Sequence, residues 1–106
     1  MKNADLPIVL AHNAPLIIRH DGTTEPLAYS SPQNENLQEI QTSLMALQTV
    51  VGGYIEAVAV PADKSLVLLV NEDGLMLKLP SNPQASAIAL RAIVGDAVLM
   101  PRALLR

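Results

Sequence analysis

The chain has 106 residues and a net charge of −3; half of its residues are apolar and only 16% are charged. This length predicts a single domain with a modest core. The mild acidity and the scattered Lys and Arg residues disfavour nucleic-acid binding, which needs a clustered basic face. The sequence has no cysteine, which excludes disulfides and thiolate metal sites and fits a reducing, cytoplasmic setting.

The balance of apolar and charged residues favours self-association. The mean hydropathy is +0.30, and a small domain with so little charge has too few polar side chains to cover its surface. We therefore expect part of the apolar surface to be buried in a homo-oligomer, the alternative being an ordinary monomer with an apolar surface. No stretch reaches the roughly 18 apolar residues of a membrane span, so no membrane association is expected.

The first part of the domain predicts a β-hairpin. Two apolar runs flank Asp21 and Gly22, a pair that is a strong signal for a tight turn between strands. We expect strands near residues 15–20 and 25–30.

A helix is predicted over residues 35–51. Its apolar residues recur at the three- and four-residue spacing that places them on one face of a helix. These residues are Leu37, Ile40, Leu44, Leu47 and Val51. Gly52 follows directly and predicts the end of the helix, because glycine readily adopts the positive φ of a C-terminal stop.

Three strands are predicted next, over residues 54–60, 66–71 and 75–79. The run LVLLVN at 66–71 is continuously apolar, which is typical of a central strand covered on both faces. The run LMLKL at 75–79 alternates, which predicts leucines pointing inward and Lys78 pointing outward.

A second helix is predicted to begin with Asn82 as its N-cap and Pro83 at its first position, followed by a last strand at 97–100. The expected fold class is α+β: a mainly antiparallel sheet of about five to six strands with two helices packed on one side. Residues 1–14 are interpreted as an N-terminal arm, and residues 15–106 as one α+β domain.

Several motifs together resemble a bacterial and phage family, a domain of unknown function numbered 3846. They are the run LQTVVGGYIE, the turn NEDG, the segment LPSN and the turn IVGD, and the resemblance covers approximately residues 15–100. It implies a setting on phages, plasmids and other mobile elements, and the family has no assigned activity. The Ala-rich segment SNPQASAIALRAI departs from the family pattern, so the resemblance supports the fold more than the second helix.

Glu56 is the first candidate site residue. It lies in an otherwise apolar predicted strand, three residues after the second glycine of the pair Gly52-Gly53. A carboxylate that is buried without a partner is costly. Glu56 therefore either lies on a solvated face of the sheet or faces a pocket and holds a ligand donor or an arginine.

The other candidates are Gly53, Tyr54, Asn71, Glu72 and Asn82. Gly53 would allow a ligand or a partner backbone to approach closely, and Tyr54 would offer a stacking face. Asn71 and Glu72 either line a site near the glycines or simply supply hairpin-turn chemistry. Asn82 is either a helix cap or a ligand contact.

We expect a small non-catalytic protein of a mobile-element or phage type, a homo-oligomer that binds a small molecule such as a nucleotide, or a host protein. An anionic ligand would need Arg19, Arg91 or Arg102 to converge from the same or a neighbouring subunit. The alternatives are a structural or adaptor module that binds proteins through its apolar surface, and an enzyme that uses Glu56 or Glu72 as a base. No cofactor, metal or catalytic residue is predicted, since no motif indicates one.

Overall fold

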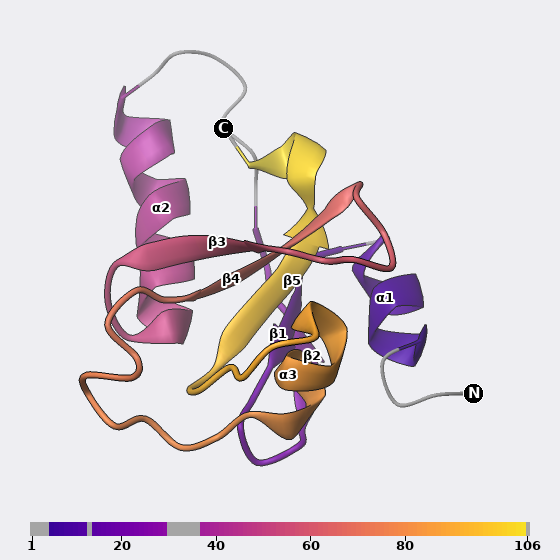
Figure 1. Cartoon of the computed structure of the whole chain (residues 1–106). Helices are drawn as coiled ribbons and strands as arrows, with labels where there is room; N and C mark the ends of the chain where they lie inside the picture. The colour runs from indigo at the N-terminus through magenta and orange to yellow at the C-terminus, as the bar shows by residue number, and fades with distance from the viewer. Residues whose placement is uncertain (1–4, 13, 30–36, 106) are drawn as a thin grey trace.

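A five-stranded antiparallel sheet forms the centre of the molecule (Figure 1). The computed structural model describes residues 5–12, 14–29 and 37–105. The strand order is β2-β1-β5-β4-β3. The strands are β1 (Leu16–Ile18), β2 (Thr24–Pro26), β3 (Ile55–Ala59), β4 (Leu66–Asn71) and β5 (Ala97–Pro101). The helices are α1 (Asp5–Ala11), α2 (Leu37–Val51), α3 (Pro83–Ala89) and a short 3-10 helix, η1 (Arg102–Leu104).

Strand β4 is buried along its whole length, as its continuous apolar run predicts. Because side chains alternate across a strand, Leu66 and Leu68 contribute to the core on one face of the sheet. Val67 and Leu69 contribute to a second core on the other face. β4 also pairs with β3 along one edge and with β5 along the other, so no side of this strand contacts solvent.

The predicted α+β class and antiparallel sheet are confirmed, but the helices cover both faces of the sheet. Leu47 of α2 packs with Val67, Leu69, Val98 and Met100 on one face. The buried residues of α1 and α3 pack on the opposite face with the alternate residues of β1, β4 and β5. The expectation of two helices on one side is therefore wrong, because a strand that is apolar on both faces needs a helix layer on each.

The long helix ends as predicted and the first hairpin forms, but its second strand, expected near residues 25–30, is limited to Thr24–Pro26. Residue 30 of the expected range lies outside the described residues. β1 pairs with β2 in an antiparallel register that places Ile17 opposite Glu25, and Gly22 in the connecting loop has a φ of 93°. Gly52 has a φ of 79°, and its N–H donates to the Gln48 carbonyl, 2.8 Å away. This positive φ is the physical reason that the helix ends here, as predicted.

Residues 75–79 do not form the predicted strand. They lie in a series of turns with Leu75, Met76 and Leu77 exposed. Local bonds satisfy the backbone: the Leu77 N–H donates to the Asp73 carbonyl, and the Leu79 N–H donates to the Gly74 carbonyl. The alternating pattern did not produce a strand because β4 already has a partner along both edges, which leaves no place for a hairpin partner.

The expected N-terminal arm contains helix α1. Ala11 at its end has no exposed surface and belongs to the core that α3 covers. The side chain of His12, Nε2, lies 2.6 Å from Asp63 Oδ2 in the β3–β4 loop. Among the described helices, none is long and apolar enough to cross a membrane.

The contrast between the buried and the exposed leucines gives a direct test of this architecture. Leu68→Ala is expected to lower the free energy of unfolding by about 2–5 kcal/mol, because it leaves a cavity at a site with no exposed surface. Leu75→Ala is expected to change it by less than about 0.5 kcal/mol. Denaturant unfolding of both variants measures the difference, and equal losses would contradict the two placements.

Candidate functional site

A shallow hollow of about 260 Å³ lies beside the ends of β3 and β4. It is lined by three of the predicted site residues, Glu56, Asn71 and Glu72, together with residues 73–76 and 91–94. The loop that follows β4 and the segment that follows α3 form its walls, so the hollow brings together parts of the chain that are about twenty residues apart in sequence. Its volume is below the roughly 300–1,000 Å³ that is usual for a site that encloses a small ligand.

Glu56 and Arg91 face one another in this hollow without a close bond. Arg91 Nη2 lies 3.9 Å from Glu56 Oε2, and the two side chains are 57% and 44% exposed. An ion pair of this length in contact with water contributes little to stability. Both groups therefore remain able to bind a partner of opposite charge.

The hollow is acidic overall. Glu56, Glu72 and Asp73 line it, and Arg91 is the one cationic side chain among its lining residues. Arg19 and Arg102 lie elsewhere: Arg19 binds Glu25 and Asp96, and Arg102 Nε donates to the Lys64 carbonyl. Within one protomer, neither Arg19 nor Arg102 joins Arg91 in lining the hollow.

Asn71 fixes the loop to the end of α2. Its Nδ2 donates to the Val51 carbonyl at 3.0 Å, and its Oδ1 accepts from the Asp73 N–H at 2.8 Å. A Cβ added at Gly53 would lie 3.0 Å from Asn71 Nδ2, so this glycine leaves room for the asparagine side chain. The close approach predicted at Gly53 is thus made by the protein's own Asn71.

Asn82 is a buried structural residue, and the predicted N-cap is confirmed. Its Oδ1 accepts from the Ala85 N–H, while its Nδ2 donates to the carbonyls of Ile18 and Gly95. The side chain has no exposed surface and does not line the hollow. It joins the end of β1, the start of α3 and the turn before β5, and so holds α3 in place.

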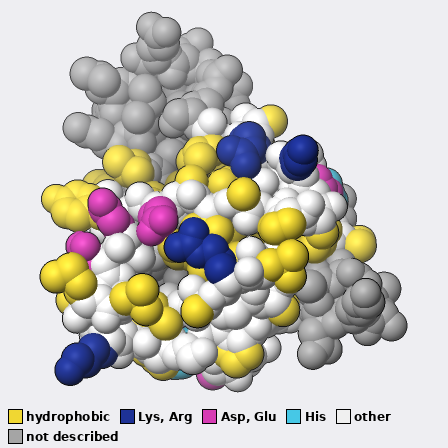
Figure 2. Space-filling view, in the orientation of Figure 1, with side chains coloured by type: hydrophobic (Ala, Val, Ile, Leu, Met, Phe, Trp, Pro, Cys, Tyr) yellow, Lys and Arg dark blue, Asp and Glu magenta, His cyan; other side chains and the backbone are white. Residues whose placement is uncertain are grey.

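Exposed apolar side chains border the hollow. Leu75 is 76% exposed, Met76 is 84% exposed and Leu90, next to Arg91, is 75% exposed. Tyr54 is exposed too, and its carbonyl accepts from the Glu72 N–H. Figure 2 shows acidic and basic side chains close together on this face with hydrophobic ones around them. We call Tyr54, Leu75, Met76, Leu77 and Leu90 the apolar rim.

Sequence reasoning singled out Tyr54 of the apolar rim but missed the apolar side chains at 75–77, because residues 75–79 alternate like a strand. Leu90 has a further unusual feature, a φ of 55° in the left-handed region at the end of α3. This backbone position favours glycine over a leucine. Neither core packing nor backbone preference explains a leucine here, because its side chain is exposed and its backbone is strained. No pattern in the sequence marks Leu90 until the end of α3 is known.

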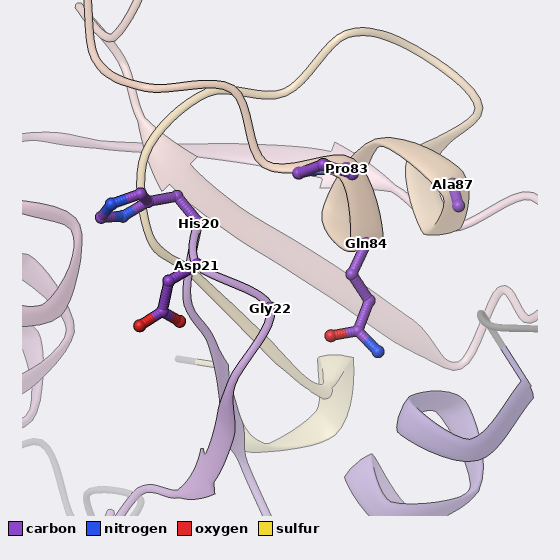
Figure 3. Close-up of a pocket in the computed structure, with 6 residues that line it drawn as sticks. All are labelled: His20, Asp21, Gly22, Pro83, Gln84 and Ala87. Carbon is purple, nitrogen blue, oxygen red and sulfur yellow. The ribbon is translucent and has the colours of Figure 1, made fainter.

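A second hollow, of about 340 Å³, lies between the β1–β2 loop and α3. Figure 3 shows its lining: His20, Asp21 and Gly22 from the loop, and Pro83, Gln84 and Ala87 from the helix. The Gln84 Oε1 is buried without a hydrogen-bond partner among the described residues. Within the described residues, no group of three His, Asp or Glu side chains could hold a metal ion.

Asp96 anchors the loop beside this second hollow. Its Oδ1 accepts from the His20 N–H at 2.9 Å, and its Oδ2 accepts from Arg19 Nη1 at 2.8 Å. Partial burial alone would raise the pKa of Asp96, but the bonds from His20 and Arg19 outweigh it and hold the pKa below its ordinary value.

Residues 27–103 match the protein family described as a domain of unknown function (DUF3846). The chain belongs to this family. No curated protein and no solved structure matches the chain. The resemblance inferred from the sequence motifs is confirmed, and the matched span includes every residue that lines the first hollow. The second helix also lies within the span, as α3 of the DUF3846 domain.

Asn71→Ala tests the structural role of this asparagine in the DUF3846 domain. The variant is expected to lower the free energy of unfolding by about 1–3 kcal/mol, because the buried Val51 carbonyl and Asp73 N–H lose their partner. Glu72→Gln, at the neighbouring exposed position, is the control and should change it by less than about 0.5 kcal/mol. Chemical denaturation gives both values, and an unaffected Asn71 variant would contradict the assignment.

Asp96→Asn tests the charge network of the same domain. A carboxylate with a lowered folded pKa contributes stability above its unfolded pKa, and this stability is lost as the pH falls through the folded pKa. The wild type should therefore lose stability below about pH 4, and the variant should lose less over the same window. Thermal melting as a function of pH measures this, and parallel curves for the two proteins would refute the assignment.

Proposed function

We propose that the protein is a non-catalytic binding module of a phage or mobile-element type, which docks a segment of a host protein on the apolar rim and the acidic hollow. The observation that carries the proposal is the apolar rim itself. Leu75 and Met76 line the same hollow as the loosely paired Glu56 and Arg91, and Leu90 is next to Arg91 in the chain. Grouped exposed apolar side chains mark sites of protein–protein contact, and here they lie beside accessible charged groups that can orient a partner.

The chemistry of the hollow suggests the kind of segment that fits. Three carboxylates against one guanidinium favour a partner with a Lys or Arg side chain over a phosphate-bearing ligand. The leucines and the methionine of the rim favour apolar side chains next to that charge, because methionine adapts to varied partners. A nucleotide fits poorly, since Arg19 and Arg102 do not line the hollow and have partners elsewhere.

Self-association and a cytoplasmic location are part of the same proposal. The low charge content and positive mean hydropathy support a homo-oligomer. The absence of cysteine from the sequence supports a reducing compartment.

The test compares variants of the apolar rim with a matched variant elsewhere. The protein is used to capture its partner from host cells, the partner is purified, and its affinity is measured with purified components. Met76→Ser is expected to weaken the affinity at least about tenfold, since one buried apolar side chain contributes about 1.5–3 kcal/mol. Leu10→Ser, at an exposed position of α1, is the control and should leave the affinity unchanged. Equal affinities for all three proteins would reject the docking surface.

Leu90 separates binding from stability. Leu90→Gly is expected to raise the free energy of unfolding by up to about 1 kcal/mol, because glycine removes the strain of the positive φ. It should also weaken partner binding, because it removes part of the apolar rim. Leu90→Ala should weaken binding without the gain in stability. A Leu90→Gly protein that binds normally would contradict a role of this side chain in docking.

A further inference from the structure

We propose that two copies of the chain pair through β3, edge to edge and antiparallel, around a two-fold axis at Ala57. The proposal gives the homo-oligomer its interface, and it rests on the self-association part of the proposed function. It does not depend on the identity of the host partner.

The two edge strands differ in their ability to accept another strand. β2 at one edge has three residues, ends in Pro26 and carries Glu25 bonded to Arg19. Short length, proline and charge are features that protect an edge from pairing. β3 at the other edge is five residues long, has no proline and carries one charged side chain, Glu56. Of the two, β3 is the edge that lacks protection.

The free backbone groups of β3 can be identified from its pairing with β4. The Tyr54 carbonyl accepts from the Glu72 N–H at 2.9 Å, and the register continues with Ile55 opposite Asn71. Antiparallel pairs alternate between bonded and non-bonded. The even-numbered residues therefore point their N–H and C=O groups at β4. The odd-numbered residues Ile55, Ala57 and Ala59 point theirs away from every described strand.

These outward groups are self-complementary. With the axis at Ala57, Ala57 faces Ala57 of the second copy, and Ile55 faces Ala59 of the second copy. Three N–H donors from each copy give about six hydrogen bonds across the seam. Glu56 faces Val58 of the second copy, so no like charges stand directly opposite. The small exposed side chains of Ala57 and Ala59 do not obstruct the approach.

The pairing also has a consequence for partner binding. A two-fold axis perpendicular to the sheet makes the same face of both copies point in one direction. Glu56 lies on the face that α1 and α3 cover, because it alternates with Val58 of the same core. The two acidic hollows would therefore lie on one side of the continuous sheet. A dimer could engage two host segments at once and bind more tightly than either hollow alone.

The test uses opposite charges placed on the proposed axis. Ala57→Lys and Ala57→Glu each place two like charges face to face, so each protein alone should be monomeric at concentrations where the wild type is dimeric. An equimolar mixture of the two should restore a one-to-one heterodimer. Ala57→Ser keeps the strand uncharged and should remain a dimer. Analytical ultracentrifugation from micromolar to millimolar concentration measures the assembly, and circular dichroism checks that each variant is folded.

Two results would overturn the proposal: a wild type that stays monomeric throughout this range, or charged variants that dimerise as well as the wild type. Amide hydrogen exchange of the unmodified protein gives a second measurement that does not depend on how the variants fold. The N–H groups of Ile55, Ala57 and Ala59 should gain protection as concentration rises, while those of Glu56 and Val58 are protected throughout. Unchanged exchange at the odd positions would reject the seam. Partner binding that persists in monomeric variants would show that the docking surface stands without it.

Discussion

The burial of β4 on every side is the constraint on which the rest of the structure depends. Its side chains enter two separate cores, and its backbone is paired along both edges. A strand in this position requires helices on both faces, and α2 supplies one layer while α1 and α3 supply the other. The free energy of burying aliphatic residues here stabilises a domain that has two tyrosines and no other aromatic residue.

The same constraint explains where the apolar rim lies. Because β4 has no free edge, residues 72–79 cannot pair with it and leave the sheet as a series of turns. Their leucines and methionine remain in solvent beside Glu56 and Arg91. Asn71 at the end of β4 holds this loop against the end of α2. The core thus determines both the position of the apolar rim and the rigidity of its support.

The sequence predicts the elements of this fold better than their arrangement. The run at 66–71, the stop at Gly52 and the cap at Asn82 are local patterns with local causes, and each one appears as expected. The strand predicted at 75–79 does not form, because a strand there depends on partners that are distant in sequence. The prediction that both helices pack on one face of the sheet is wrong for the same reason.

The residues of the candidate site also divide into those that local sequence patterns predict and those that they do not. Glu56, Asn71 and Glu72 come together in one hollow, as their proximity to the two glycines and the turn suggested. Arg91 lines the hollow from the segment that follows α3, and Leu90 has a left-handed backbone conformation at the end of that helix. A spacing pattern in the sequence reveals neither feature. Asn82, in contrast, is committed to three internal bonds that fix α3.

Native mass spectrometry of the protein purified from its own cells, without refolding, tests the central claim most directly. The account predicts a dimer that carries no small-molecule mass and that retains a copurified polypeptide under gentle conditions. A non-protein adduct of nucleotide size, retained in proportion to the protein, would contradict the account. It would show that the protein holds a small anion, which the three carboxylates of the hollow disfavour.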